Sequence, residues 1–141
     1  MKKVILGATG SIGSSLAKQL VESREQVHLV GRDESSLSEL ANELNSSYTA
    51  CDVLEENFSE KIVNDLKDEQ VNGLAYCVGS IDLKPLKLTK KSDFMQSFNL
   101  NLVAATEIIK SLADNLKTNK GSIVLFSTVA VKQGFPNHTI V

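Results

Sequence analysis

The feature that most constrains this fold is a glycine-rich turn joining a short apolar strand to an amphipathic helix. Residues 4–6 form the apolar run, and it continues directly into Gly7-Ala8-Thr9-Gly10-Ser11-Ile12-Gly13. Helical spacing over residues 11–23 then predicts an apolar stripe of Ile12, Leu16, Leu20 and Val21. A buried strand that passes through glycines straight into a helix is typical of the first unit of an α/β sheet.

The rest of the chain repeats this alternation of apolar strands and amphipathic helices. We expect strands at 27–30, 48–51, 73–78 and 122–127, and helices at 34–44, 58–66 and 92–116. Continuous apolar strands separated by helices predict a parallel sheet covered on both faces. Right-handed crossovers then favour a Rossmann-like, doubly wound α/β fold of three layers with strand order 3-2-1-4-5. In such a sheet the ligand crevice lies at the carboxyl ends of strands one and four.

The composition is that of an ordinary globular protein, and it excludes several classes of function. We expect residues 1–141 to form a single domain. The 15 basic and 17 acidic residues leave a formal charge of -2, too small to attract nucleic acid or an anionic membrane. No apolar stretch approaches the length of about 18 residues that a membrane span needs. The two cysteines, Cys51 and Cys77, fit a reducing cytoplasm, and we expect no metal site.

The glycine turn has the chemistry of a phosphate-binding loop. Gly7 permits a sharp turn, Gly10 lets the backbone approach a phosphate, and Gly13 lets the helix pack closely on the sheet. The free N–H groups and the positive dipole at the helix start then favour a pyrophosphate. We therefore assign a dinucleotide to Gly7, Thr9, Gly10, Ser11, Ile12 and Gly13. The alternatives are a turn without a ligand, as in flavodoxin-like domains, and an S-adenosylmethionine site, which usually has an acidic residue after strand two.

The end of strand two indicates which dinucleotide is bound. An acidic residue there selects NAD, whereas this chain has Gly31 followed by Arg32. Glycine leaves room for a 2′-phosphate, and a guanidinium pairs with phosphate or stacks on adenine. We favour NADP(H) and keep NAD(H) possible, because Asp33 and Glu34 could repel the phosphate or bridge Arg32. The simpler alternative is that Arg32 is a solvated charge and Asp33 caps the next helix.

With these segments in place, the whole chain resembles the short-chain dehydrogenase/reductase (SDR) family. The resemblance implies that Asp52, followed by Val53, contacts the adenine, although an aspartate here also forms turns and caps. In the family an Asn-Asn-Ala-Gly segment walls the riboses, and this chain has Tyr76-Cys77-Val78-Gly79. Only the glycine matches, so the resemblance assigns Gly79 and the adjoining Cys77 to the cofactor. We interpret Cys77 as a small buried residue and not as a redox thiol.

The resemblance also implies catalytic positions. Asn101 matches the family asparagine, which distorts its helix and orders a water in a proton relay; Asn99 is a near neighbour, and a solvated asparagine is the alternative. Thr128 matches the family serine that polarises a substrate carbonyl, with Ser127 just before it. These three residues, Asn101, Ser127 and Thr128, are the candidate catalytic set.

The remaining catalytic pair of the family is missing from this sequence. Its tyrosine and lysine lie beyond strand five, but no tyrosine follows Tyr76 and no lysine follows Lys132. We interpret the chain as a truncated N-terminal part whose C-terminal catalytic part is missing. We expect an inactive fragment of an oxidoreductase that acts on a small carbonyl or alcohol substrate. The alternative is a non-catalytic dinucleotide-binding or sensor module, with Val141 natively at the tyrosine position; His138 is interpreted as a loop residue.

The helix predicted at 92–116 carries more apolar surface than one sheet face needs. Its apolar residues are Phe94, Phe98, Leu102, Ile108, Ile109 and Leu112. In the family, the resemblance implies, the equivalent helix joins a four-helix dimer interface. We therefore expect a homo-oligomer formed through this helix and the edge of strand five.

Overall fold

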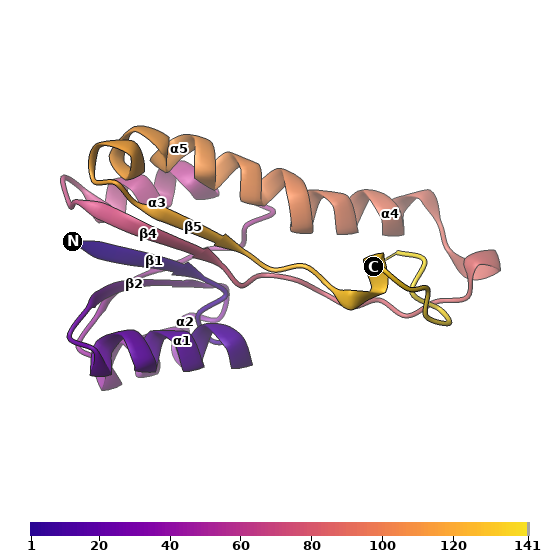
Figure 1. The fold of residues 1–141 in the computed structure, drawn as a ribbon, viewed down its shortest axis with the longest axis horizontal. Helices are drawn as coiled ribbons and strands as arrows, with labels where there is room; N and C mark the ends of the chain where they lie inside the picture. The colour runs from indigo at the N-terminus through magenta and orange to yellow at the C-terminus, as the bar shows by residue number, and fades with distance from the viewer. Residues whose placement is uncertain (141) are drawn as a thin grey trace.

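Five parallel strands form one sheet in the computed structural model, which describes residues 1–140 (Figure 1). The order is β3-β2-β1-β4-β5, so the predicted winding is confirmed. The strands are β1 (Lys2–Leu6), β2 (Gln26–Gly31), β3 (Ser47–Ala50), β4 (Val71–Tyr76) and β5 (Ser122–Leu125). β3 begins one residue before its predicted start, and β5 ends two residues before its predicted end.

Helices cover both faces of the sheet and complete the three predicted layers. Helices α1 (Ser11–Glu22) and α2 (Glu34–Glu43) lie on one face, and α3 (Phe58–Leu66) and α5 (Ala104–Thr118) lie on the other (Figure 1). The first pair packs on a core that includes Ile5, Leu29 and Leu37. The second packs on a larger core that includes Phe58 and Ile108. The apolar spacing that predicted these helices is therefore the spacing that buries them.

Two helical predictions were wrong in detail. The expected helix at 92–116 is divided into α4 (Lys91–Phe98), a π-helical turn η2 (Asn99–Val103) and α5. The stripe expected on α1 is correct for Leu16, Leu20 and Val21, which pack against the core, but not for Ile12, which is 54% exposed. The residues that α1 buries fully are the small Gly13 and Ala17, and at Gly13 the helix lies too close to the chain beneath it for any side chain.

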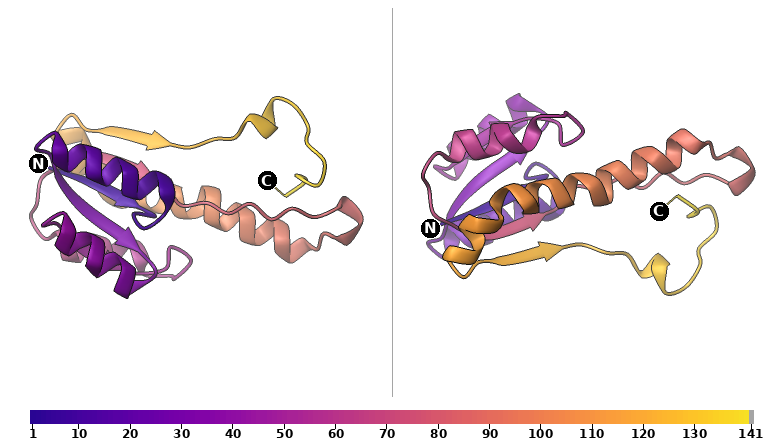
Figure 2. Two further views of the ribbon diagram at one scale, coloured as in Figure 1. Left: turned by 90° about the horizontal axis from the view of Figure 1, so that it is seen from below. Right: turned by 90° about the horizontal axis from the view of Figure 1, so that it is seen from above.

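The segments that follow β4 and β5 run past the end of the sheet, beside α4 (Figure 2). They meet where the backbone N–H of Lys84 donates to the carbonyl of Asn137 at 3.0 Å. Short 3-10 turns at η1 (Leu86–Leu88) and η3 (Val129–Val131) interrupt these segments. Ser97 of α4 donates to the carbonyl of Ile140 at 3.0 Å, so the chain returns to the helix. Of the helices within residues 1–140, none has the length and apolarity that crossing a membrane requires.

Candidate functional site

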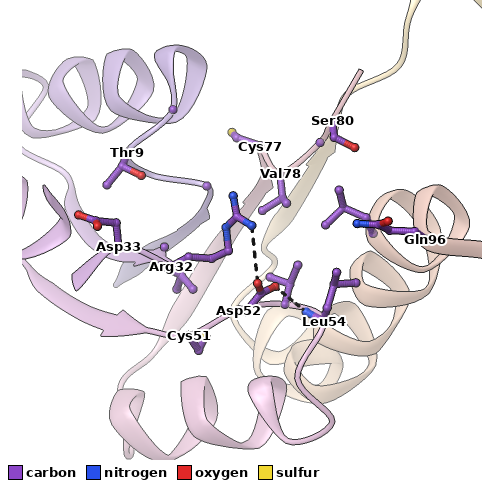
Figure 3. Close-up of a pocket in the computed structure, with 17 residues that line it drawn as sticks. Thr9, Arg32, Asp33, Cys51, Asp52, Leu54, Cys77, Val78, Ser80 and Gln96 are labelled. Carbon is purple, nitrogen blue, oxygen red and sulfur yellow. Dashed lines mark hydrogen bonds and ion pairs between the residues drawn. The ribbon is translucent and has the colours of Figure 1, made fainter. Parts of the chain in front are cut away.

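A cavity of about 360 Å³ opens at the carboxyl ends of β1, β2, β3 and β4, where the winding of the sheet reverses (Figure 3). Its volume lies in the range of small-molecule sites. Most of the predicted cofactor residues line it: Gly7, Thr9, Gly10, Gly31, Arg32, Asp52, Val53, Cys77 and Gly79. The other three, Ser11, Ile12 and Gly13, lie beside it in the first turn of α1. Residues far apart in the sequence are thus brought together as expected for ligands at a switch point.

Steric contact explains two glycines of the turn. Gly7 has φ +74°, and a Cβ there would lie 2.9 Å from the carbonyl carbon and oxygen of Cys77. A Cβ on Gly13 would lie 2.2 Å from the carbonyl oxygen of Gly7. Gly13 therefore lets the start of α1 lie closely against the residues that directly follow β1. Both glycines hold the loop tightly folded under the start of α1.

The start of α1 is open for an anion. Gly10 is the N-cap and provides no side-chain acceptor for the first helical N–H groups, and no acidic residue lies in the first turn of this described helix. The N–H groups of a helix start carry partial positive charge and need partners from outside the helix. The half-exposed side chain of Ile12 borders this helix start. The arrangement therefore suits a phosphate group.

Arg32 lies at the mouth of the cavity and pairs with Asp52. Its Nη1 is 3.7 Å from Oδ2 of Asp52, and its side chain is 78% exposed (Figure 3). The other carboxylate oxygen of Asp52 accepts from the N–H of Leu54 at 3.0 Å, so Asp52 also forms a turn. Asp33 caps α2 by accepting from the N–H of Ser36 at 2.7 Å, and hydrogen bonds from Ser36 lower the pKa of Asp33. The bridge considered between Arg32 and Asp33 is therefore replaced by one to Asp52.

Asn101 lies within the π turn η2, so the helix is distorted at the position that the resemblance indicated. Its Nδ2 donates to the carbonyl of Ser97 at 2.9 Å. Its Oδ1 faces Gly79, where a Cβ would be 3.4 Å away. Asn101 thus contacts a residue that lines the cavity, although Asn101 itself is not among the lining residues of the described chain.

The other two candidate catalytic residues lie away from the cavity. Thr128 follows β5, and its Oγ1 accepts from the N–H of Ala130 at 3.2 Å as the cap of η3. Ser127 is exposed, and neither residue is among those that line the cavity in the described chain. His138 lies in the loop that precedes the chain end, with Nδ1 2.8 Å from the carbonyl oxygen of Pro136.

Burial keeps both cysteines as thiols. It raises the pKa of Cys51 to about 11, and it also raises the pKa of Cys77. Both are free, and within residues 1–140 no group of three His, Cys, Asp or Glu side chains is placed to hold a metal ion. Neither cysteine therefore has the thiolate character of a redox centre.

Sequence analysis did not assign eight of the residues that line the cavity, which are Val30, Asp33, Cys51, Leu54, Val78, Ser80, Gln96 and Leu100. Leu54 and Ser80 directly follow predicted residues, so extending each motif by one position would have found them. Gln96 carries no such signal, because α4 brings it to the cavity from a distant part of the sequence.

Comparison with known proteins places the chain among dehydrogenases. The family model described as short chain dehydrogenase matches residues 2–140. L-Fucose dehydrogenase of Oryctolagus cuniculus is 28% identical over 141 residues, covering 94% of this chain and 50% of that protein. The 3-oxoacyl-[acyl-carrier-protein] reductase FabG of Rickettsia bellii (strain RML369-C) is 27% identical over 137 residues, covering 94% of this chain and 56% of that protein.

Solved structures agree on the fold. The KRED1-Pglu enzyme superposes with a TM-score of 0.93 at 16% identity, over 99% of this chain and 61% of that one. The closed form of serine dehydrogenase complexed with NADP+ superposes with a TM-score of 0.90 at 19% identity, over 99% of this chain and 59% of that one. The chain thus spans about half the length of the curated relatives it matches. Because the family model covers nearly every residue, the chain belongs to the short chain dehydrogenase family.

Proposed function

We propose that this chain binds NADP(H) in the cavity at the glycine turn, as the cofactor-binding part of an oxidoreductase. The observation that carries the proposal is the open start of α1 beside that cavity, where Gly10 leaves the first N–H groups free for a pyrophosphate. Gly10 also fits this role because a side chain there would stand between the backbone and the phosphate. The residues present therefore fit the cofactor that the family uses.

We assign a different group of cavity residues to each part of the cofactor. The first turn of α1 would hold the pyrophosphate. Gly31, Thr9 and Arg32 would surround a 2′-phosphate. A Cβ added to Gly31 would lie 3.6 Å from Oγ1 of Thr9, so these two residues are neighbours. Asp52 and Val53 would border the adenine, and Gly79 would lie against a ribose. The bound NADP+ of the structurally similar serine dehydrogenase supports the choice of NADP(H).

The proposed chemistry is the oxidation or reduction of a small alcohol or carbonyl compound, for which NADP(H) supplies hydride transfer. Asn101 and Thr128, with Ser127, are the proposed polar groups for the substrate side. The names of the relatives, a fucose dehydrogenase and an oxoacyl reductase, support this substrate class. The two free thiols with raised pKa values suit a reducing compartment, and we propose the cytoplasm.

The 141 residues supply no tyrosine after Tyr76 to donate a proton to the carbonyl oxygen. We therefore expect them to bind the cofactor without turning over a substrate. The second candidate is a non-catalytic dinucleotide-binding module, which the use of the Thr128 hydroxyl as a helix cap favours. Consumption of NADPH with a panel of aldehydes and ketones would contradict the expected inactivity and favour the enzyme.

Calorimetry with NADPH and NADH tests the proposed cofactor. We expect Arg32→Ala to weaken NADPH binding by about 10- to 100-fold and to leave NADH binding almost unchanged, because one charge-assisted contact is lost. Lys110→Ala is the matched control, since it removes one exposed positive charge from α5, far from the cavity. If neither cofactor binds the wild-type chain, the proposal is wrong. If Arg32→Ala weakens both cofactors equally, the 2′-phosphate assignment is wrong.

A further inference from the structure

The π turn between α4 and α5 changes the hydrogen bonding of the helix at one carbonyl. The N–H of Ala104 donates to the carbonyl of Asn99, five residues back. In an α-helix that N–H would donate to Leu100, four residues back. The carbonyl of Leu100 therefore loses its regular helical donor. Single π turns of this kind occur frequently at functional sites.

Tyr76 supplies a donor to that carbonyl. Its hydroxyl donates to the carbonyl oxygen of Leu100 at 2.6 Å. The side chain is 3% exposed and belongs to the same core as Ala104 and Ile108 of α5. Burial raises the pKa of Tyr76, so its hydroxyl keeps the proton that this bond needs. A buried hydroxyl and a displaced carbonyl thus satisfy each other, which buried polar groups require.

The π turn determines where Asn101 points. Asn101 directly follows Leu100, and its Oδ1 faces Gly79 at the cavity rim while its Nδ2 is held by the carbonyl of Ser97. Each residue of an α-helix turns the side chain by about 100°. If the π turn changed to a regular α-helix, Asn101 would rotate away from Gly79 or α4 would have to turn relative to α5.

Tyr76 is well placed to prevent this loss, because it ends β4 just before the cavity-lining segment. It occupies the first position of Tyr76-Cys77-Val78-Gly79, and its backbone pairs with Leu6 on one side and Leu125 on the other. The hydroxyl therefore ties the π turn to the centre of the sheet, three residues before Gly79. Both ends of the contact between Asn101 and Gly79 are fixed through this one residue.

We infer that Tyr76 is a positioning residue, whose hydroxyl holds the π turn so that Asn101 stays against Gly79 and supports cofactor binding there. This inference rests on the proposed NADP(H) site. Tyr76 itself does not line the cavity in the described chain, so it acts through Leu100 and Asn101. Tyr76 does not match the asparagine that the family has at this position, and the positioning role gives its side chain a different function in this chain.

Tyr76→Phe tests the inference, since it removes only the hydroxyl. Tyr48→Phe is the matched control: Tyr48 is the other tyrosine of the chain, and its hydroxyl makes no side-chain hydrogen bond among the described residues. Heteronuclear NMR of the free protein would follow the side-chain amide of Asn101 and the backbone amide of Gly79. Calorimetry would measure NADPH binding by the wild type and both variants.

We expect Tyr76→Phe to shift both NMR signals and to weaken NADPH binding threefold or more, while Tyr48→Phe changes neither. Unchanged signals, or an affinity within twofold of the wild type, would overturn the inference. Failure of the wild type to bind NADPH would instead overturn the proposed function, and the NMR signals would still report whether Tyr76 positions Asn101. If Tyr76→Phe does not fold, the wild-type hydroxyl proton should exchange slowly and show cross-peaks to Leu100 and Asn101. Their absence would also refute the inference.

Discussion

At the scale of single residues, the buried His28 is held in a directed chain of hydrogen bonds on the α3 face of the sheet. Lys2 donates to Oγ of Ser47 at 2.8 Å, and that oxygen is 2.9 Å from Nδ1 of His28. On the other side, Nε2 of His28 is 2.9 Å from Oγ1 of Thr49, which donates to Asp65 at 2.6 Å. Since the single Thr49 proton goes to Asp65, His28 donates through Nε2. Burial lowers the pKa of His28, so the ring is neutral near pH 7 and its Nδ1 accepts from the hydroxyl of Ser47.

The neutral His28 and its hydrogen bonds predict that the protein loses stability in acid. Burial, with a smaller contribution from Lys2, lowers the pKa of His28 from 6.5 to about 4, while Asp65 and Glu69 oppose the shift. The unfolded chain thus binds a proton that the folded chain excludes, so stability is full above pH 6.5 and falls as the pH drops toward 4. Between pH 7 and pH 5 we expect His28 to remove about 2 kcal/mol from the free energy of unfolding.

Urea denaturation at pH 7 and pH 5 measures this effect. His28→Gln keeps a donor and an acceptor but cannot titrate, so its stability should depend less on pH than that of the wild type. An equal pH dependence for the two proteins would show that His28 is not the group responsible. The sequence could not predict these hydrogen bonds. Residues 27–30 are apolar except for His28, and the hydrogen-bond partners of His28 come from other elements.

At the scale of elements, Asn115 near the end of α5 joins that helix to the start of β4. Its Oδ1 accepts from the N–H of Val71 at 2.8 Å, and its Nδ2 donates to the carbonyl of Glu69 at 3.0 Å. Asn115→Ala would leave the N–H of the buried Val71 without this acceptor. We expect a loss of about 1–3 kcal/mol in the free energy of unfolding, measured by denaturant titration. Asn64→Ala on the exposed face of α3 is the control, and an equally small effect of both substitutions would contradict this role of Asn115.

Most elements could be predicted because the same apolar periodicity that identifies them also buries them. The resemblance implied a distorted helix at Asn101, but the apolar spacing did not predict a π turn. Leu100, Ala104, Ile108, Leu112 and Leu116 repeat every four positions across it, which is the pattern of one continuous helix. The hydrogen bond between Tyr76 and Leu100 depends on the packed sheet and could not be predicted from this spacing.

At the scale of the whole molecule, the fold and the cavity could be predicted because strand order follows from a few topological rules. The glycine turn, Arg32 and Asp52 meet at the cavity as expected, since each follows a strand of one parallel sheet. Thr128 could not be placed in the same way. It also follows a strand, but its hydroxyl caps η3, a local hydrogen bond that competes with the site.

The exposed apolar surface of this molecule predicts that it self-associates. All four residues of β5, the last strand of the described sheet, are exposed, and so are Phe98 at the end of α4 and Leu102 of η2. An exposed edge strand and an exposed apolar helix face are both typical surfaces for pairing with another chain. We expect sedimentation velocity to show a mass that rises with protein concentration.

Phe98→Glu with Leu102→Glu should shift the protein toward the monomer with little loss of stability, because both side chains are about half exposed already. Lys110→Glu, which changes an exposed charge on the following helix α5, should leave the association intact. A wild-type monomer at every concentration would refute this prediction, and equal association of the Phe98 and Leu102 variant would place the contact on another surface.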